Sequence, residues 1–324
     1  MHPTLKQFAL TTLATLAFGS LAQAASYPDR PITLVNPYAV GGPADQLARV
    51  LAQGLGEQLG QSVIVENKAG GGASIGAGYV AKAPADGYTL LFGTSAAHVT
   101  TPAATQVPYQ GIQDFAFIGI VANVPNILTV HPSVQAQDLP GFIALAKQQP
   151  GKISYASAGL GSSPHIGMEM FKAKTGTELQ HIPYRGAAPA ATDLVAGTVQ
   201  VGMLNISGVQ AFVNDKRLRA LAYGGQERAK TLPDVPTFAE AGLADFVTGS
   251  WYSLAAPAGT PQPVIDRLAQ ALATVQGSET FTKAAAQQSA EIYRLSPAET
   301  LTFVQKDLAT TQDLIKTTGM KLTD

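Results

Sequence analysis

The chain contains no cysteine, few charged residues and a single tryptophan. The absence of cysteine excludes disulfides, thiolate zinc sites and cysteine nucleophiles. Charged residues make up 13% of the chain and the formal net charge is -1, so the sequence offers no basic face for nucleic acid. With 46% hydrophobic residues, the composition is that of a folded protein with a large core. A length of 324 residues suits two domains.

One long apolar run is present, and it lies at the N-terminus. It extends over residues 8–22 without a charge, follows a leader that carries Lys6, and ends at the small residues Ala22 and Ala24. This arrangement predicts a secretory signal peptide, residues 1–24, cleaved after Ala24. A membrane anchor is the less favoured reading, because a spanning helix needs ~20 apolar residues. We therefore expect a mature protein in the periplasm.

Strands and helices alternate along the rest of the chain. Residues 32–35 form a short apolar run typical of a buried strand, and leucines at 47, 51, 55 and 59 then recur on one face of a helix. Such alternation predicts the α/β class, with parallel sheets covered by helices. Further strands are expected at 63–65, 89–92, 127–130, 153–156, 179–182, 201–204, 218–222 and 251–255. Further helices are expected at 79–82, 139–149, 163–175, 187–196, 210–214, 261–275, 279–288 and 297–317.

The predicted strands and helices are too many for one sheet with its covering helices, so we predict two α/β domains. No low-complexity linker separates them, which favours a discontinuous first domain. The predicted first domain comprises residues 25–123 and 249–324, and the second comprises residues 124–248. The chain would cross between the domains near Asn123 and near Thr248.

Three glycine-containing loops that join a strand to a helix are candidate ligand contacts, at residues 36–45, 157–165 and 183–189. Glycine lets the backbone approach a ligand, and helix N-termini favour anions. In open α/β sheets such loops lie at the carboxyl ends of strands, where ligands bind. The predicted ligand-binding residues, in these loops and at two further strand ends, are Tyr38, Ala39, Val40, Gly41, Gly42, Asp45, Ser95, Ala97, Ser157, Gly161, Ser162, Ser163, His165, Tyr184, Arg185, Gly186 and Asn205.

Several of these side chains have alternative uses. Arg185 either pairs with a carboxylate or forms a surface salt bridge. For Asp45, in a first helical turn, complementing the helix dipole is the preferred role. His165 either hydrogen-bonds a ligand or caps a loop. Trp251 either packs in the core, which we favour, or faces the cleft.

Signatures of catalysis and of metal or cofactor binding are nearly absent. The sequence has no P-loop, and the glycines from Gly70 onward do not fit a dinucleotide motif. The five histidines show no metal-ligand spacing. Residues 93–97 resemble a nucleophile elbow but lack its final glycine, which makes a serine hydrolase using Ser95 the rival class. We expect no enzymatic activity, no metal and no cofactor.

Short motifs in a fixed order add a family resemblance. They lie at residues 27–32, 41–45 with 48–49, 65–72, 86–91, 161–165, 183–186, 232–237 and 256–261. With them, the chain resembles over nearly its whole mature length the extracytoplasmic solute receptors of tripartite tricarboxylate transporters, often called Bug receptors.

The resemblance implies a two-domain clamshell of the type II periplasmic binding-protein kind. Its cleft would hold a small carboxylate, such as a dicarboxylic acid, an acidic amino acid or an aromatic acid, through main-chain groups and ordered water. Membrane transporter subunits or a sensor-kinase ectodomain would then recognise the closed form of a monomeric receptor. Residues 38–40 and Ala44 depart from the usual family pattern, so the resemblance names no single ligand.

Overall fold

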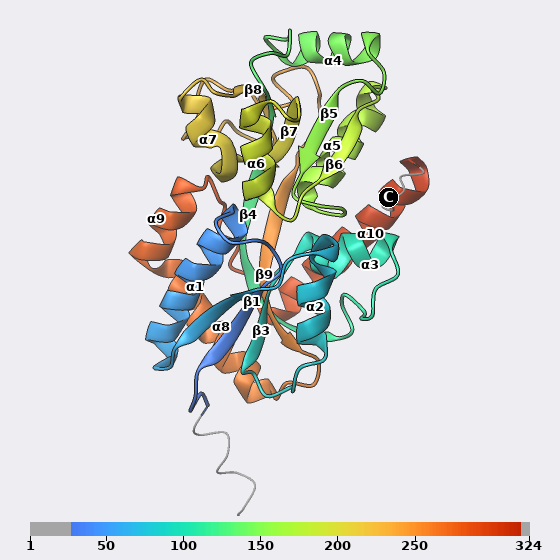
Figure 1. Ribbon diagram of the computed structural model, residues 1–324. Coiled ribbons are helices and arrows are strands. Elements are labelled where there is room, and N and C mark those ends of the chain that lie inside the picture. The colour runs from blue at the N-terminus through green and yellow to red at the C-terminus, as the bar shows by residue number, and fades with distance from the viewer. Residues whose placement is uncertain (1–26, 319–324) are drawn as a thin grey trace, which may run out of the picture.

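The computed structural model describes residues 27–318, so the predicted signal peptide lies outside the described part (Figure 1). The strands are β1 (Ile32–Asn36), β2 (Val63–Asn67), β3 (Thr89–Thr94), β4 (Phe115–Val130), β5 (Ser154–Ser157), β6 (Gln180–Pro183), β7 (Val201–Asn205), β8 (Arg219–Tyr223) and β9 (Gly249–Pro257). The helices are α1 (Pro43–Leu59), η2 (Gly71–Ala73), α2 (Ser74–Ala81), η3 (Ala96–Thr100), α3 (Thr101–Ala104), α4 (Leu139–Gln148), α5 (Ser163–Thr175), α6 (Ala187–Ala196), α7 (Ile206–Asn214), α8 (Gln262–Gly277), α9 (Glu279–Gln287) and α10 (Pro297–Thr318).

The strands form one continuous path in the order β2-β1-β3-β9-β4-β7-β5-β6, with β8 also paired to β4. β1 is parallel to β2 and β3, and β5 is parallel to β6 and β7, as the alternation predicts. The two strands in the middle differ from the prediction. β9 is antiparallel to β3 and β4, and β4 is antiparallel to β7 and β8. The sheet is therefore mixed.

Strand β4 belongs to both parts of the molecule. Its residues Phe115–Pro125 pair with β9, and its residues Asn126–Val130 pair with β7 and β8. We call the part built on β1, β2 and β3 the first half, and the part built on β5 to β8 the second half. β4 and β9 run between them in the centre of Figure 1. The sequence predicted only the last four residues of β4, because two register shifts and Pro125 interrupt the period-two pattern of its first part.

Helices cover both faces of the strands in each half (Figure 1). In the first half, α1 packs beside α8 and α9 on one face, and its predicted stripe of leucines is buried, with Leu47, Leu51 and Leu55 fully inaccessible. On the other face lie α2, α3 and α10. In the second half, α4 and α5 share a core around Phe142 and Phe171, whereas α6 and α7 lie on the opposite side. Among the described helices, none is long and apolar enough to cross a bilayer.

Candidate ligand-binding site

A pocket lies where the two halves meet, with about 390 Å³ of empty space including its opening to solvent. The first half contributes the loop after β1, the end of β3 and the start of β9, and the second half contributes the N-termini of α5 and α6 and the end of β7. None of the lining residues carries a formal charge. The lining residues are Tyr38, Ala39, Gly42, Pro43, Ala44, Thr94, Ser95, Ala158, Pro164, Ala187, Asn205, Ser250 and Tyr252.

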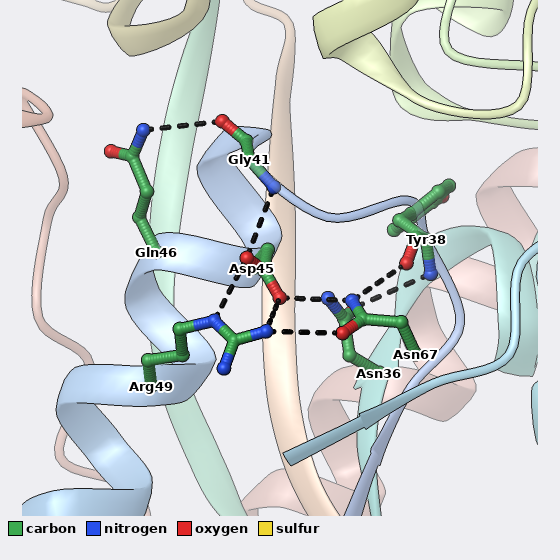
Figure 2. Close-up of polar contacts among 7 residues, drawn as sticks. All are labelled: Asn36, Tyr38, Gly41, Asp45, Gln46, Arg49 and Asn67. Carbon is green, nitrogen blue, oxygen red and sulfur yellow. Dashed lines mark hydrogen bonds and ion pairs between the residues drawn. The ribbon is translucent and has the colours of Figure 1, made fainter.

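The loop between β1 and α1 is held from beneath by the buried carboxylate of Asp45 (Figure 2). Its Oδ2 accepts hydrogen bonds from the Gly41 amide and from Arg49 Nε, both at 3.0 Å. Its Oδ1 accepts from Arg49 Nη2 at 3.0 Å and from Asn67 Nδ2 at 2.9 Å. Asn67 Nδ2 also donates to the Tyr38 carbonyl at 2.9 Å. Asp45 thus ties the loop to α1 and β2.

These hydrogen bonds decide the ionisation of Asp45. Burial by itself raises the pKa of the carboxyl, but the hydrogen bonds from Arg49, Gly41 and Asn67 together outweigh burial and lower the pKa from its ordinary value. Asp45 is therefore a carboxylate that fixes the loop conformation. It does not line the pocket, and its position in the first turn of α1 also complements the helix dipole.

Two helix N-termini face each other across the pocket. The N-caps of α1 and α6 are Gly42 and Gly186, and neither helix has a side-chain cap. A Cβ built on Gly42 would lie 3.7 Å from the Ala188 nitrogen, in the first turn of α6. The Ala39 amide donates to the Arg185 carbonyl at 3.3 Å, which joins the two loops. Opposed positive helix ends repel each other, so an anion placed between them stabilises this arrangement.

The third helix N-terminus at the pocket belongs to α5. Ser162 caps it by accepting from the His165 amide at 3.4 Å, and His165 Nδ1 accepts from the Gly161 amide at 3.1 Å. The His165 ring stacks on the His181 ring, with centroids 4.0 Å apart. Burial, followed by the nearby Lys172 charge, lowers the pKa of His165 to about 4. His165 is therefore a neutral residue that holds the loop.

The inner wall of the pocket carries uncharged hydrogen-bonding groups. Tyr252 and Ser250, two residues apart on β9, face the pocket together with Asn205. Burial raises the pKa of Tyr38 to about 12 and that of Tyr252 further, so both phenols keep their protons. Such a wall can donate hydrogen bonds to a ligand oxygen. Trp251, between these two β9 residues, points to the core as favoured from the sequence, and its Nε1 donates to Asp307 at 2.9 Å.

The structure divides the predicted ligand-binding residues into three groups. Those that line the pocket are Tyr38, Ala39, Gly42, Ser95 and Asn205. Tyr184 and Arg185 line a separate groove. The remaining predicted residues line neither space: Val40, Gly41, Asp45, Ala97, Ser157, Gly161, Ser162, Ser163, His165 and Gly186.

Members of the third group serve mainly to hold loops and elements together. Ser157 Oγ lies 2.7 Å from His181 Nε2 and accepts from the Gly159 amide. The Ala97 carbonyl accepts from Tyr109 at 2.8 Å inside the core. Val40 is 64% exposed and does not line the pocket. Position after a strand predicted proximity to the pocket, but it did not reveal which way each side chain points.

Within the described residues, Arg185 does not form the surface salt bridge that was one of its two alternatives, and its pairing with a ligand carboxylate stays a prediction. Its side chain is exposed and forms no ion pair or hydrogen bond with any described residue. It lines a groove at the seam of the two halves, together with Pro37, Ile75 and Leu160. The arginine is therefore outside the uncharged pocket.

Ser95 lines the pocket but lacks the partner that a nucleophile needs. In the described part of the chain, no histidine nitrogen is hydrogen-bonded to its hydroxyl. His98, three residues later, bonds the Gly111 carbonyl at 2.8 Å through Nδ1 and packs among Phe115, Phe117 and Trp251. Burial lowers the pKa of His98 to about 4. Within the described residues, no cluster of acidic residues and histidines is placed to hold a metal.

Several pocket residues were not predicted from the sequence. The omitted residues are Pro43, Ala44, Thr94, Ala158, Pro164, Ala187, Ser250 and Tyr252. A signal existed for two of them. Ser250 and Tyr252 alternate with Trp251 on a strand, so both must share the face opposite the tryptophan.

Comparison with known proteins fits this geometry. The family model described as "Tripartite tricarboxylate transporter family receptor" matches residues 47–320. The chain belongs to this family. It is 35% identical to BugT of Bordetella pertussis (strain Tohama I) over 312 residues, which is 96% of each protein. The name BugT connects this relative with the Bug receptors that the chain resembles in sequence.

Solved structures agree with the fold. A structure of an R. palustris protein with adipate has a TM-score of 0.87 and 35% identity, and the match covers 91% of this chain and 99% of that one. MatC from Rhodopseudomonas palustris with bound malate has a TM-score of 0.85 and 28% identity, with 89% and 100% covered. The fold is the two-domain α/β clamshell of periplasmic binding proteins. The family and its structural neighbours are solute-binding receptors and not enzymes, which rules out the serine hydrolase.

Proposed function

We propose that this protein captures a small carboxylate in the pocket between its halves and delivers it to a tripartite tricarboxylate-type transporter. The observation that carries the proposal is the opposition of two uncapped helix N-termini, α1 at Gly42 and α6 at Gly186, across an uncharged pocket. Backbone N–H groups and helix dipoles there favour an anion. The adipate and malate in the two similar structures support a carboxylate.

The ligand's carboxylate would lie between these helix ends, and the rest of it along the hydroxyl-bearing wall. Thr94, Ser95, Ser250 and Tyr252 can each donate or accept hydrogen bonds there. A dicarboxylate, an acidic amino acid and an aromatic acid are the three candidate classes. Ligand contacts to both halves would favour the closed arrangement over an open one.

The two halves are proposed to move as domains, residues 25–123 with 249–324 and residues 124–248. This division is supported by the change of partner strand within β4 at Asn126 and by the start of β9 at Gly249. The chain would cross near Asn123 and near Thr248, as proposed from the sequence. Receptors of this kind close by a hinge motion around their ligand.

The proposed function also includes export of the chain and recognition of the receptor by a membrane protein. The N-terminal segment would direct the chain to the periplasm and be removed after Ala24. The monomeric receptor would then present its closed form to membrane transporter subunits. A sensor-kinase ectodomain is the alternative recipient.

Calorimetry with matched ligands tests the proposed function. Adipate, malate, glutamate and nicotinate represent the candidate classes, and each is compared with its methyl ester or amide. We expect binding of at least one acid and none of its uncharged derivative, because the derivative offers the helix ends no negative charge. Equal affinity for an acid and its ester would refute anion recognition.

A further inference from the structure

Asn205 connects the pocket to both strands that run between the halves. It is 4% exposed, ends β7 and lines the pocket. Its Nδ2 lies 3.0 Å from the Val124 carbonyl and 2.9 Å from Asn126 Oδ1, both on β4. The same nitrogen lies 3.0 Å from Ser250 Oγ, on β9. One side chain of the second half therefore reaches both crossing strands.

A second amide extends this connection. Asn126 Nδ2 donates to Ser163 Oγ and to Thr248 Oγ1, each at 2.9 Å. Ser163, in the first turn of α5, in turn donates to the Gly249 carbonyl at the start of β9. We call Asn126, Ser163, Asn205, Thr248 and Ser250 the crossing network. All five side chains are buried and uncharged.

The crossing network has more acceptors than hydrogens at one point. Asn205 Nδ2 has two hydrogens and three acceptors within 3.0 Å. Ser250 Oγ also lies 3.4 Å from Asn205 Oδ1, so its hydroxyl either accepts from the amide or donates to it. When it accepts, its hydrogen is free for a group in the pocket. The same hydroxyl thus belongs to the pocket wall and to the crossing.

We propose that Asn205 is a positioning residue that fastens the second half to β4 and β9 and holds the halves in the closed arrangement. Its hydrogen bonds join β7 to the two strands at the place where β4 changes its pairing partner. An opening motion that rotates β7 away from β9 must break the contact between Asn205 and Ser250. Loss of that contact shifts the balance between closed and open forms toward the open form.

Electron-spin distance measurements without ligand test this proposal directly. The chain has no cysteine, so Gln53→Cys on α1 and Thr192→Cys on α6 provide two unique labelling sites on exposed positions of opposite halves. The variants are Asn205→Ala and Ser250→Ala. Thr129→Val is the matched control, because Thr129 Oγ1 also joins β4 to β7, through the Gly202 carbonyl at 3.2 Å, but away from the crossing.

We expect Ser250→Ala to raise the ratio of open to closed molecules about fivefold, the effect of one lost hydrogen bond, and Asn205→Ala to raise it further. Thr129→Val should lower the urea midpoint of unfolding without changing the distance distribution. That difference separates a positioning role from a general loss of stability. If Asn205→Ala does not fold, Ser250→Ala decides the question.

Distance distributions of folded Asn205→Ala and Ser250→Ala that equal that of the parent would overturn the proposal. A shift of the same size in Thr129→Val would also overturn it, because a hydrogen bond away from the crossing would then affect opening as much as one in the crossing network. The measurement uses no carboxylate, so its outcome is independent of whether the proposed ligand class is right. Calorimetry on the same proteins reports on the ligand separately.

Discussion

The carbonyl oxygen of Leu160, in the second half, lies directly against Gly72 of the first half. A Cβ built on Gly72 would overlap this oxygen and would stand 2.8 Å from Thr101 Oγ1. Thr101 Oγ1 in turn donates to the Gly72 carbonyl at 2.7 Å. The halves therefore meet at a position where only a hydrogen fits, which makes Gly72 a probe of the proposed closure.

Gly72→Ala should hinder closure, and Gly60→Ala should not. Both glycines have a left-handed φ, +60° and +70°, so alanine costs each about 1 kcal/mol of backbone strain. A Cβ on Gly60 meets nothing within 4 Å, whereas one on Gly72 meets the Leu160 carbonyl of the opposite half and Thr101 Oγ1 of its own half. We expect a lower melting temperature for Gly72→Ala, because its Cβ also crowds Thr101, and a longer distance between labels on α1 and α6 for Gly72→Ala alone. Identical distances in the two variants would show that the contact between Gly72 and Leu160 adjusts to the added methyl group without separating the halves.

Gly42→Val and Arg185→Ala separate two modes of carboxylate recognition. Valine at 42 places side-chain atoms opposite the Ala188 nitrogen, between the two helix ends, and should weaken carboxylate binding at least tenfold. Arg185→Ala should change the dissociation constant less than threefold, because its side chain lines the groove and not the pocket. Calorimetry measures both. A charge-assisted hydrogen bond is worth about 1.5–3 kcal/mol, so a loss of one to two decades in Arg185→Ala alone would indicate an arginine clamp.

Asp45→Ala should destabilise the first half and loosen the ligand loop. The substitution removes the acceptor of the Gly41 amide and of Asn67 Nδ2, and leaving such groups without partners costs about 1–3 kcal/mol. Urea unfolding measures this loss. The exposed arginine contributes little to it, since Arg49 is half accessible. An Asp45→Ala protein with parental stability and affinity would show that the loop keeps its conformation without the carboxylate.

Stability should fall as the pH falls from about 6.5 to about 4. The pKa of His165 is lowered to about 4, so the unfolded chain takes up a proton at higher pH than the folded chain does. A difference of this size corresponds to up to about 3 kcal/mol, fully lost once the pH is below the folded value. Urea unfolding at several pH values should show a shallower dependence for His165→Asn. An unchanged slope would mean that His165 titrates normally.

Processing of the N-terminus is tested by mass spectrometry. The protein recovered from the periplasm should begin at Ala25, because the small residues at 22 and 24 define the predicted cleavage site. Replacing Ala24 with a bulky residue should cause the precursor to accumulate. A mature protein that retains Met1 would contradict export by this route.

The sequence predicted the repeating elements well because their patterns are local. The expected bounds of α5 and α6 agree with the structure, and the leucine stripe of α1 is buried as expected. Helix α2 begins at Ser74, five residues before its expected start, because three glycines with positive φ precede it and their flexibility masks the boundary. The antiparallel placement of β4 and β9 depends on partners far away in sequence, which no local pattern encodes.

The location of the pocket could be predicted from the sequence, but the full set of side chains that line it could not. Glycines and strand ends identified the loops, and Gly42, Ala39 and Tyr38 do line the pocket. Asp45 and His165 carry groups typical of binding sites, but the structure uses those groups to hold loops. The contact between Ser250 and Asn205 depends on the placement of β9 and β7 on either side of β4, which is a long-range relationship.

Strand β4 runs without interruption from Phe115 to Val130, so its backbone is hydrogen-bonded on both sides of the crossing. A receptor whose halves were joined by free loops could swing widely, because loops change φ and ψ at little cost. Here, motion of one half relative to the other would instead have to twist β4, because β4 continues through the crossing whereas β9 begins there. Under the proposed domain division, the movement would therefore be a limited rotation about one line, which would return the same pocket walls to the same facing positions at each closure.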